Sequence, residues 1–259
     1  MEQQSFERVP AFEYKAPPDL SNAFQRFKLD SGNDTFRHNV LTFITLFVLI
    51  IVYPGVSLLG VGEDPAAMFK SLTPAALMFL LITTVLMQWI IFLLNFVAVY
   101  TEKTGLGGLM LTRIKTIDFA WAISFVLASN LILSGLAWFL AQIGLPMIGE
   151  VGLLVPSDTY GRILWVAVAF TAGFCEEVAF RGYLMTRIRL LGKFKSWIIP
   201  TFASALIFGT CHAYQGLPGF IVITVYGLMF SLLYIRTGRL WPCIIAHFFQ
   251  DFSALFFPQ

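Results

Sequence analysis

The sequence predicts an all-α fold, a polytopic bundle of transmembrane helices. Hydrophobic residues make up 58% of the 259 residues and charged residues only 12%, whereas a soluble domain carries about 25% charged residues. The mean hydropathy is +0.77, and the apolar residues lie in long runs that short polar connections separate. Runs of this kind are typical of helices that cross a lipid bilayer.

Seven of these runs are candidate membrane spans. A bilayer core about 30 Å thick needs roughly 20 apolar residues in a helix. The run GLPMIGEVGLLVP (144–156) is an alternative eighth, re-entrant segment, which would reverse the orientation of the spans that follow it. The seven expected spans are 40–60, 75–100, 117–141, 162–187, 196–213, 218–236 and 240–257.

The first 38 residues differ from the rest of the chain because they are polar and carry charges of both signs. They contain no apolar segment that a signal peptidase would recognise. We expect residues 1–38 to form a mostly unstructured cytosolic tail, and residues 39–259 to form a single transmembrane domain.

Lysine and arginine residues are concentrated in alternate connections. Of the 17 in the chain, fifteen lie in the N-terminal tail and in the second, fourth and sixth connections, with Arg187 and Arg189 counted in the fourth. Only Lys70 and Arg162 lie in the other connections. Cytoplasmic connections carry an excess of basic residues, so we expect the N-terminus in the cytosol and the C-terminus on the opposite side.

Few ionisable side chains lie inside the expected spans. Of the fifteen acidic residues, twelve are in the tail, in connections or at span ends, and the exceptions are Glu176, Glu177 and Asp251. His212 and His247 also lie inside spans. A charge at the centre of a bilayer costs roughly 2.5 to 3.5 kcal/mol. These side chains must therefore contact one another or line a cavity that contains water.

Helical spacing indicates which of these residues share a face. Glu177 and Arg181 are four residues apart, so an intrahelical ion pair is expected. Glu176 points about 100° away from Glu177 in a regular helix and is free for another contact. The same four-residue spacing recurs in FGTCH (208–212) and HFFQD (247–251).

The three segments also lie at a similar depth. A rise of about 1.5 Å per residue, counted from the basic connections, brings Glu176, His212, His247 and Asp251 to a common level in the bilayer. A carboxylate and an imidazole at one depth are a natural pair for activating water. An ion-pair cluster that fixes the helix packing, or a proton relay, would use the same residue types.

Three motifs resemble the signatures of a known family. EEVAFR (176–181), FGTCH (208–212) and HFFQD (247–251) are similar to the EExxxR, FxxxH and HxxxN/D patterns of the CAAX protease and bacteriocin-processing (CPBP, or Abi) family of intramembrane proteases, which includes the type II CAAX prenyl endopeptidases. The resemblance covers about 160–257, which would be the catalytic core. It implies an endopeptidase that cleaves a membrane-associated peptide or a prenylated protein tail.

The resemblance also implies roles for single residues. Glu176 and His212 would orient and deprotonate the attacking water, while His247 and Asp251 would hold the developing oxyanion or orient the other pair. Prenyl-protein members of the family typically have Asn at the position of Asp251, and an ionised Asp cannot donate a hydrogen bond to an oxyanion. Supporting roles are implied for Glu177, Arg181 and Phe208.

The cofactor requirement has two alternatives. The family has been described both as metal-free and as metal-dependent, so the resemblance implies either no cofactor or a divalent metal such as zinc. Glutamate and histidine side chains suit zinc, and the zinc ligands would be Glu176, His212 and His247. The chain contains no HExxH sequence.

Two other classes of function remain open. The chain could be a non-catalytic bacteriocin-immunity or membrane-binding protein on the same scaffold, or a proton-coupled transporter. We expect a peptide or lipidated-protein substrate and the lipid bilayer as partners, and no nucleic acid, because no basic patch is present. The resemblance implies the plasma (inner) membrane of a prokaryote. Cys175, Cys211 and Cys243 lie in apolar runs, where free cysteine is a common small hydrophobic residue.

Overall fold

The computed structural model describes residues 38–60, 65–111, 113–147 and 151–256, and all regular secondary structure in these ranges is helical. The expected N-terminal tail, apart from His38, lies outside the described residues. The first half contains α1 (Val40–Phe47), η2 (Val48–Val52), α2 (Tyr53–Leu59), α3 (Pro65–Lys70), α4 (Pro74–Thr101), η3 (Gly105–Leu109) and α5 (Thr116–Gln142). The second half contains η4 (Val151–Leu154), α6 (Thr159–Thr171), η5 (Ala172–Glu176), η6 (Val178–Leu184), α7 (Met185–Leu191), α8 (Ile198–Thr210), η7 (Ala213–Gln215), α9 (Gly216–Thr237) and α10 (Trp241–Ser253).

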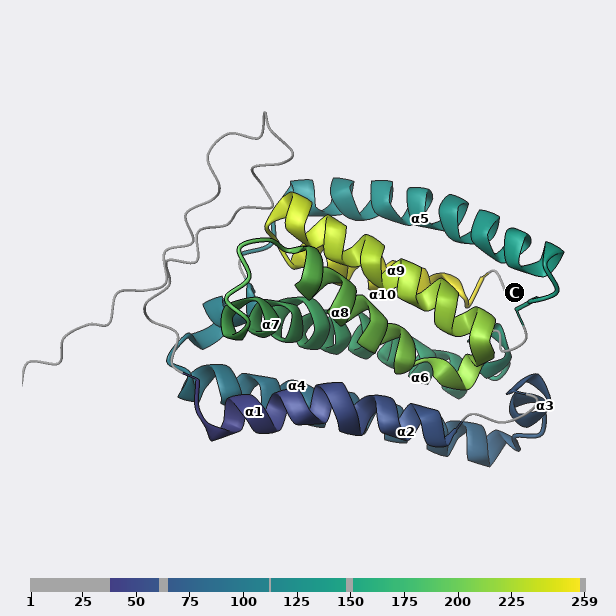
Figure 1. Ribbon diagram of the computed structural model, residues 1–259. Coiled ribbons are helices and arrows are strands. Elements are labelled where there is room, and N and C mark those ends of the chain that lie inside the picture. Colours follow the sequence, from purple (N-terminus) through teal and green to yellow (C-terminus); the bar gives the residue numbers. More distant parts are fainter. Residues whose placement is uncertain (1–37, 61–64, 112, 148–150, 257–259) are drawn as a thin grey trace, which may run out of the picture.

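The long helices lie side by side in one bundle (Figure 1). α5 runs along one side, α1, α2 and α4 run along the opposite side, and α6 to α10 lie between them. The helix from α6 to α7 is the most deeply placed, because 67% of its most apolar window is buried, against 17% for the windows of α4 and α5. The bundle therefore surrounds this helix with more exposed apolar helices.

Five helices in the described part of the chain are long and apolar enough to cross a membrane. They agree with the first, second, third, fourth and sixth expected spans: Val40–Leu59, Pro74–Thr101, Thr116–Gln142, Thr159–Leu191 and Ala213–Thr237. α8 and α10, at the fifth and seventh expected spans, have 13 residues each, fewer than the roughly 20 that a full crossing needs. A count of seven or eight spans stays a prediction. In the alternative eighth segment, the structure has only the short η4 and describes nothing of 148–150.

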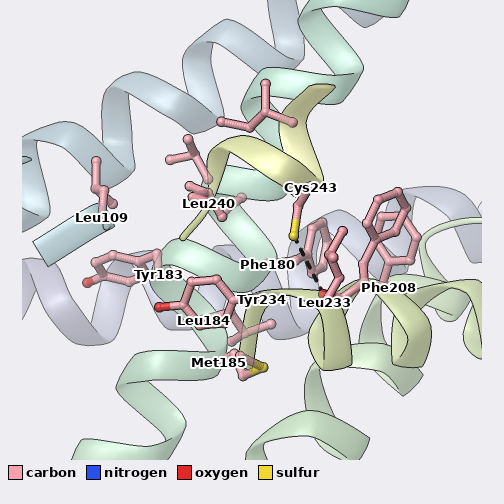
Figure 2. Packing of buried hydrophobic residues seen from close by; sticks show 14 of the residues in the cluster. Leu109, Phe180, Tyr183, Leu184, Met185, Phe208, Leu233, Tyr234, Leu240 and Cys243 are labelled. Atoms are coloured by element: carbon pink, nitrogen blue, oxygen red, sulfur yellow. Dashed lines mark hydrogen bonds between the residues drawn. The ribbon is translucent and has the colours of Figure 1, made fainter. Parts of the chain in front are cut away.

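The main apolar core forms around the middle of the bundle (Figure 2). Phe180 of η6 meets Phe208 of α8 edge-on, with ring centroids 5.0 Å apart. The Cys243 thiol of α10 donates to the Phe230 carbonyl oxygen at 3.6 Å. All three cysteines are buried and free.

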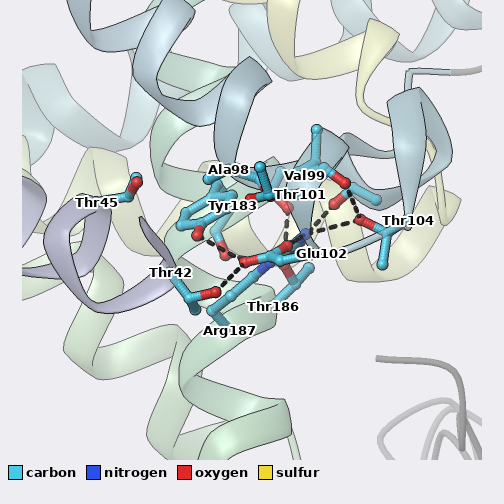
Figure 3. A network of polar contacts seen from close by, with 12 residues as sticks. Thr42, Thr45, Ala98, Val99, Thr101, Glu102, Thr104, Tyr183, Thr186 and Arg187 are labelled. Atoms are coloured by element: carbon cyan, nitrogen blue, oxygen red, sulfur yellow. Dashed lines mark hydrogen bonds and ion pairs between the residues drawn. The ribbon is translucent and has the colours of Figure 1, made fainter. Parts of the chain in front are cut away.

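A second buried feature is a polar network between α1, α4 and α7 (Figure 3). Both oxygen atoms of the Glu102 carboxylate accept hydrogen bonds: Oε1 from Thr42 and Tyr183, both at 2.8 Å, and Oε2 from Arg187, at 2.6 and 3.2 Å. Arg187 also donates to the carbonyl oxygen of Gly108. A fully bonded carboxylate of this kind holds helices in one arrangement.

Two basic residues of the fourth expected connection are buried in the protein. Arg187 and Arg189, which were counted as residues of a cytosolic connection, are only 2% and 7% exposed. Arg187 is buried because Glu102 neutralises it, and the Arg189 guanidinium lies over the Trp197 ring at 4.6 Å. Both side chains are therefore buried within the protein, and the expected position of this connection relative to the membrane stays a prediction.

Candidate active site

The EEVAFRG segment lies on a helix that departs from regular α-helical geometry. η5 and η6, on either side of Glu177, are π-helical, and their i→i+5 hydrogen bonds make each turn wider than in an α-helix. Successive side chains are therefore turned by less than the expected 100°. As a result Glu176 and Glu177 both reach the imidazole of His247, Glu177 at 2.9 Å from Nδ1 and Glu176 at 4.0 Å from Nε2.

The expected ion pair between Glu177 and Arg181 is confirmed. Arg181 Nη1 lies 2.9 Å from Glu177 Oε1, and both side chains are fully buried. Arg181 Nη2 donates to the Gly227 carbonyl oxygen at 3.1 Å. The guanidinium also lies over the rings of Phe208 and Phe230, at 4.4 and 5.0 Å. These contacts compensate the burial of the arginine charge.

His247 of α10 is held in one orientation. Its Nδ1 lies 2.9 Å from Glu177 Oε1, and because an ionised carboxylate only accepts, Nδ1 carries a hydrogen. The ring stacks against Phe230 at 5.2 Å. Nε2 is 3.6 Å from Asp251 Oδ2 and 4.0 Å from Glu176 Oε2. Three carboxylates around one imidazole stabilise a positive charge on it.

The approach of α10 to the glutamates depends on Gly173. A Cβ atom at this position would lie 2.7 Å from the Phe248 amide nitrogen and 3.1 Å from the Ile244 carbonyl oxygen. Only a glycine lets the two backbones come this close. Because His247 lies between Ile244 and Phe248 in the sequence, this contact sets its distance from Glu176.

His212 lies directly after α8, beside the same cluster. Its Nδ1 donates to the Phe208 carbonyl oxygen at 2.9 Å, so Nε2 of the neutral ring remains an acceptor. The Phe208 ring lies 4.9 Å from the His212 ring and 6.3 Å from the His247 ring. Phe208 thus links His212 to the cluster. None of the hydrogen bonds or ion pairs described for His212 reaches Glu176, so their joint action on water stays a prediction.

Two residues near the cluster were missed from the sequence. Gln88 of α4 donates from Nε2 to Glu176 Oε1 at 2.6 Å, and both side chains are buried. A polar side chain inside the apolar run 75–100 was the available signal. Tyr226 of α9 packs against His247, with ring centroids 6.3 Å apart, and its buried hydroxyl has no hydrogen-bond partner among the described residues.

The described side chains do not fit a metal site. Among them, no group of three or more His, Cys, Asp and Glu is arranged to hold a metal ion. Nδ1 of His247 is bonded to Glu177 and Nδ1 of His212 to Phe208, which leaves one ring nitrogen on each for any further contact. We therefore derive no reaction step through a metal.

Comparison with known proteins gives one match. Residues 158–253 match the family model described as "Type II CAAX prenyl endopeptidase Rce1-like". The matched region contains all three motifs and excludes α1 to α5, including Gln88. No curated protein and no solved structure matches the chain.

Proposed function

We propose that this chain, whose residues 158–253 belong to the type II CAAX prenyl endopeptidase Rce1-like family, is an endopeptidase that works inside the membrane. Its substrate is a membrane-associated peptide or a prenylated protein tail. One observation carries the proposal beyond the family match. Glu176 Oε2 is buried and has no hydrogen-bond partner among the described residues, 4.0 Å from an imidazole nitrogen. A buried carboxylate oxygen without a donor is suited to accept a proton from water.

Glu176 is the general base in this mechanism. A water molecule donates one hydrogen to Glu176 Oε2 and the other to His212 Nε2. As the water oxygen bonds to the scissile carbonyl carbon, its proton passes to Glu176 and the carbonyl oxygen becomes an oxyanion. When the C–N bond breaks, Glu176 returns the proton to the leaving amine. His212 suits its role because its Nδ1 hydrogen is engaged by Phe208.

His247 is the donor to the oxyanion. The neighbouring carboxylates of Glu177 and Asp251, at 2.9 and 3.6 Å, favour a ring that carries hydrogens on both nitrogens. Such a ring donates from Nδ1 to Glu177 and from Nε2 to the oxyanion. One well-placed donor of this kind contributes about 10²- to 10³-fold in kcat. Asp251 assists through the charge of His247, because an ionised carboxylate cannot donate a hydrogen bond itself.

The direction of insertion is also proposed. The N-terminus faces the cytosol, and the protein lies in the inner membrane of a prokaryote. The uneven distribution of lysine and arginine between the connections supports this orientation. Labelling of a single cysteine introduced near His38 in intact and permeabilised cells tests it, and labelling in intact cells would contradict it.

Cleavage by the purified protein tests the proposed function. Wild-type protein in liposomes is expected to release the C-terminal residues of a prenylated peptide, and Glu176→Gln and His212→Ala are each expected to lower kcat by at least about 100-fold. Cleavage that survives both substitutions would contradict the mechanism and favour a non-catalytic role on the same scaffold. Chelation of divalent metals is expected to leave the rate unchanged, and a loss of activity that zinc restores would show that the reaction needs the metal.

A further inference from the structure

We propose that Gln88 is a positioning residue for the catalytic carboxylate: its amide holds one oxygen atom of Glu176 so that the other faces the water and the substrate. This inference rests on the proposed function, because it assigns Gln88 to the general base of that reaction. It adds a residue from the N-terminal half of the chain, outside the family match at 158–253.

The contact between the two side chains is direct and shielded. Gln88 Nε2 donates to Glu176 Oε1 at 2.6 Å, and the two residues are only 4% and 6% exposed. Because an ionised carboxylate accepts and does not donate, the amide nitrogen faces it and the amide oxygen faces away. The bond occupies Oε1, so Oε2 is the oxygen left for water.

The remaining contacts of Gln88 argue against a purely structural role. Its Oε1 is buried without a hydrogen-bond partner among the described residues. A buried amide whose oxygen has no donor weakens a fold and does not strengthen it. A polar group kept at a cost to stability is expected at functional sites.

The neighbouring residue anchors α4 at this level of the bundle. Trp89 Nε1 donates to Thr171 Oγ1 at 3.2 Å, and its ring lies 6.0 Å from the ring of Phe174. Both partners precede Glu176 by a few residues on the same helix. The register between α4 and the catalytic helix is thereby fixed where Gln88 meets Glu176. A carboxylate held in one geometry reacts faster than one that is free to rotate, and a displacement of about 1 Å can cost 10²-fold in rate.

The test is the substitution Gln88→Met, which keeps the length of the side chain and removes both polar groups. We expect kcat for cleavage, measured per folded molecule, to fall about 10- to 100-fold with KM unchanged. Gln142→Met, at an exposed position at the end of α5, is the matched control and is expected to leave both quantities unchanged.

Gln88→Glu is the second variant, and it has almost the shape of the native residue. It brings a second carboxyl group against Glu176, and two carboxyls at this distance share a proton, which removes the general base. We expect kcat to fall further than in Gln88→Met. This variant keeps the inference falsifiable if Gln88→Met does not fold.

The outcomes separate the inference from the proposed function. A Gln88→Met protein that unfolds at a lower temperature but cleaves at the wild-type rate per folded molecule would overturn the inference, as would a Gln88→Glu protein with wild-type kcat. In both cases a loss of cleavage in Glu176→Gln would leave the proposed function intact. If the wild-type protein shows no cleavage that depends on Glu176, the proposed function and the inference fail together.

Discussion

At the residue scale, the two adjacent glutamates differ in the charge that they neutralise, although each has one buried oxygen without a hydrogen-bond partner among the described residues. Oε1 of Glu177 receives hydrogen bonds from Arg181 and His247, both at 2.9 Å. Oε1 of Glu176 receives one from Gln88, and its Oε2 has no partner among the described residues. Glu177 is therefore the counter-charge of the buried Arg181, whereas the nearest cationic group described for Glu176 is the more distant His247 Nε2, at 4.0 Å. The first stabilises the fold, and the second costs stability.

This contrast predicts opposite effects of the same chemical change. Glu177→Gln leaves the fully buried Arg181 without its counter-charge, and we expect a loss of about 3–5 kcal/mol in the free energy of unfolding. Glu176→Gln removes a buried carboxylate whose contact with His247 is long, at 4.0 Å, so its thermal unfolding midpoint is expected to equal or exceed that of the wild type. Thermal denaturation of the wild type, Glu176→Gln and Glu177→Gln in one detergent ranks their unfolding midpoints. A Glu176→Gln protein less stable than Glu177→Gln would contradict this assignment.

Single contacts could be predicted from the sequence only within one helix. The four-residue spacing predicted the pair Glu177–Arg181, which is confirmed. The bond between Glu177 and His247, and the bond between Gln88 and Glu176, join residues 70 and 88 positions apart. Helical spacing says nothing about which face of one helix meets another, so these partners were not predictable.

At the element scale, the shape of the site depends on the π-helical segments η5 and η6 and on the close contact between η5 and α10. The wider turns bring both glutamates toward α10, and Gly173 lets the two backbones meet. The geometry of the site therefore depends on how closely η5 and α10 approach each other, as well as on the residues that they carry.

A methyl group at Gly173 is predicted to separate the two helices. In Gly173→Ala, the new Cβ atom would lie 2.7 Å from a backbone nitrogen of α10, so α10 must shift and carry His247 away from Glu176. We expect kcat to fall about 100-fold, the effect of a displacement near 1 Å. Gly135→Ala in α5 is the matched control, since a Cβ atom there meets nothing within 4 Å. Equal rates for the two variants would contradict the proposed role of this contact.

Element bounds were largely predictable, but element geometry was not. The expected spans 40–60, 75–100 and 117–141 agree closely with Val40–Leu59, Pro74–Thr101 and Thr116–Gln142, because the length of an apolar run determines where a helix begins and ends. The π-helical segments and the shortness of α8 and α10 were not predicted. Hydropathy reports which residues avoid water, and it carries no information on the hydrogen-bond pattern of the backbone.

At the scale of the whole molecule, buried charge is confined to a few places within the described residues. One is the candidate active site around Glu176 and His247, and another is the fully bonded network of Glu102 and Arg187 between α1, α4 and α7. A third ion pair, between Asp118 and Arg239, joins α5 to the segment before α10 at 2.6 Å. The last two join the N-terminal half to the family-matched part, and the hydrogen bond from Gln88 joins α4 to the first. The composition predicted an all-α membrane bundle. It could not predict which helices these ion pairs join.

The central claim is that Glu176 activates water for peptide cleavage, and Glu102 provides a control of the same residue type. Both carboxylates are buried, at 6% and 0% exposure, but Glu102 lies in the polar network and not in the candidate active site. Glu102→Gln changes a buried carboxylate to an amide outside the proposed chemistry, and it lowers stability because Arg187 loses its counter-charge. It therefore reports what a destabilised but chemically intact protein does.

The most direct measurement compares wild type, Glu176→Gln and Glu102→Gln, expressed at equal levels in the native host. Mass spectrometry of peptide termini in the membrane and secreted fractions reports every cleavage without a chosen substrate. We expect new termini with the wild type and with Glu102→Gln, compared at equal amounts of inserted protein, and none of them with Glu176→Gln. Identical termini with wild type and Glu176→Gln, when both proteins are inserted and equally abundant, would contradict it.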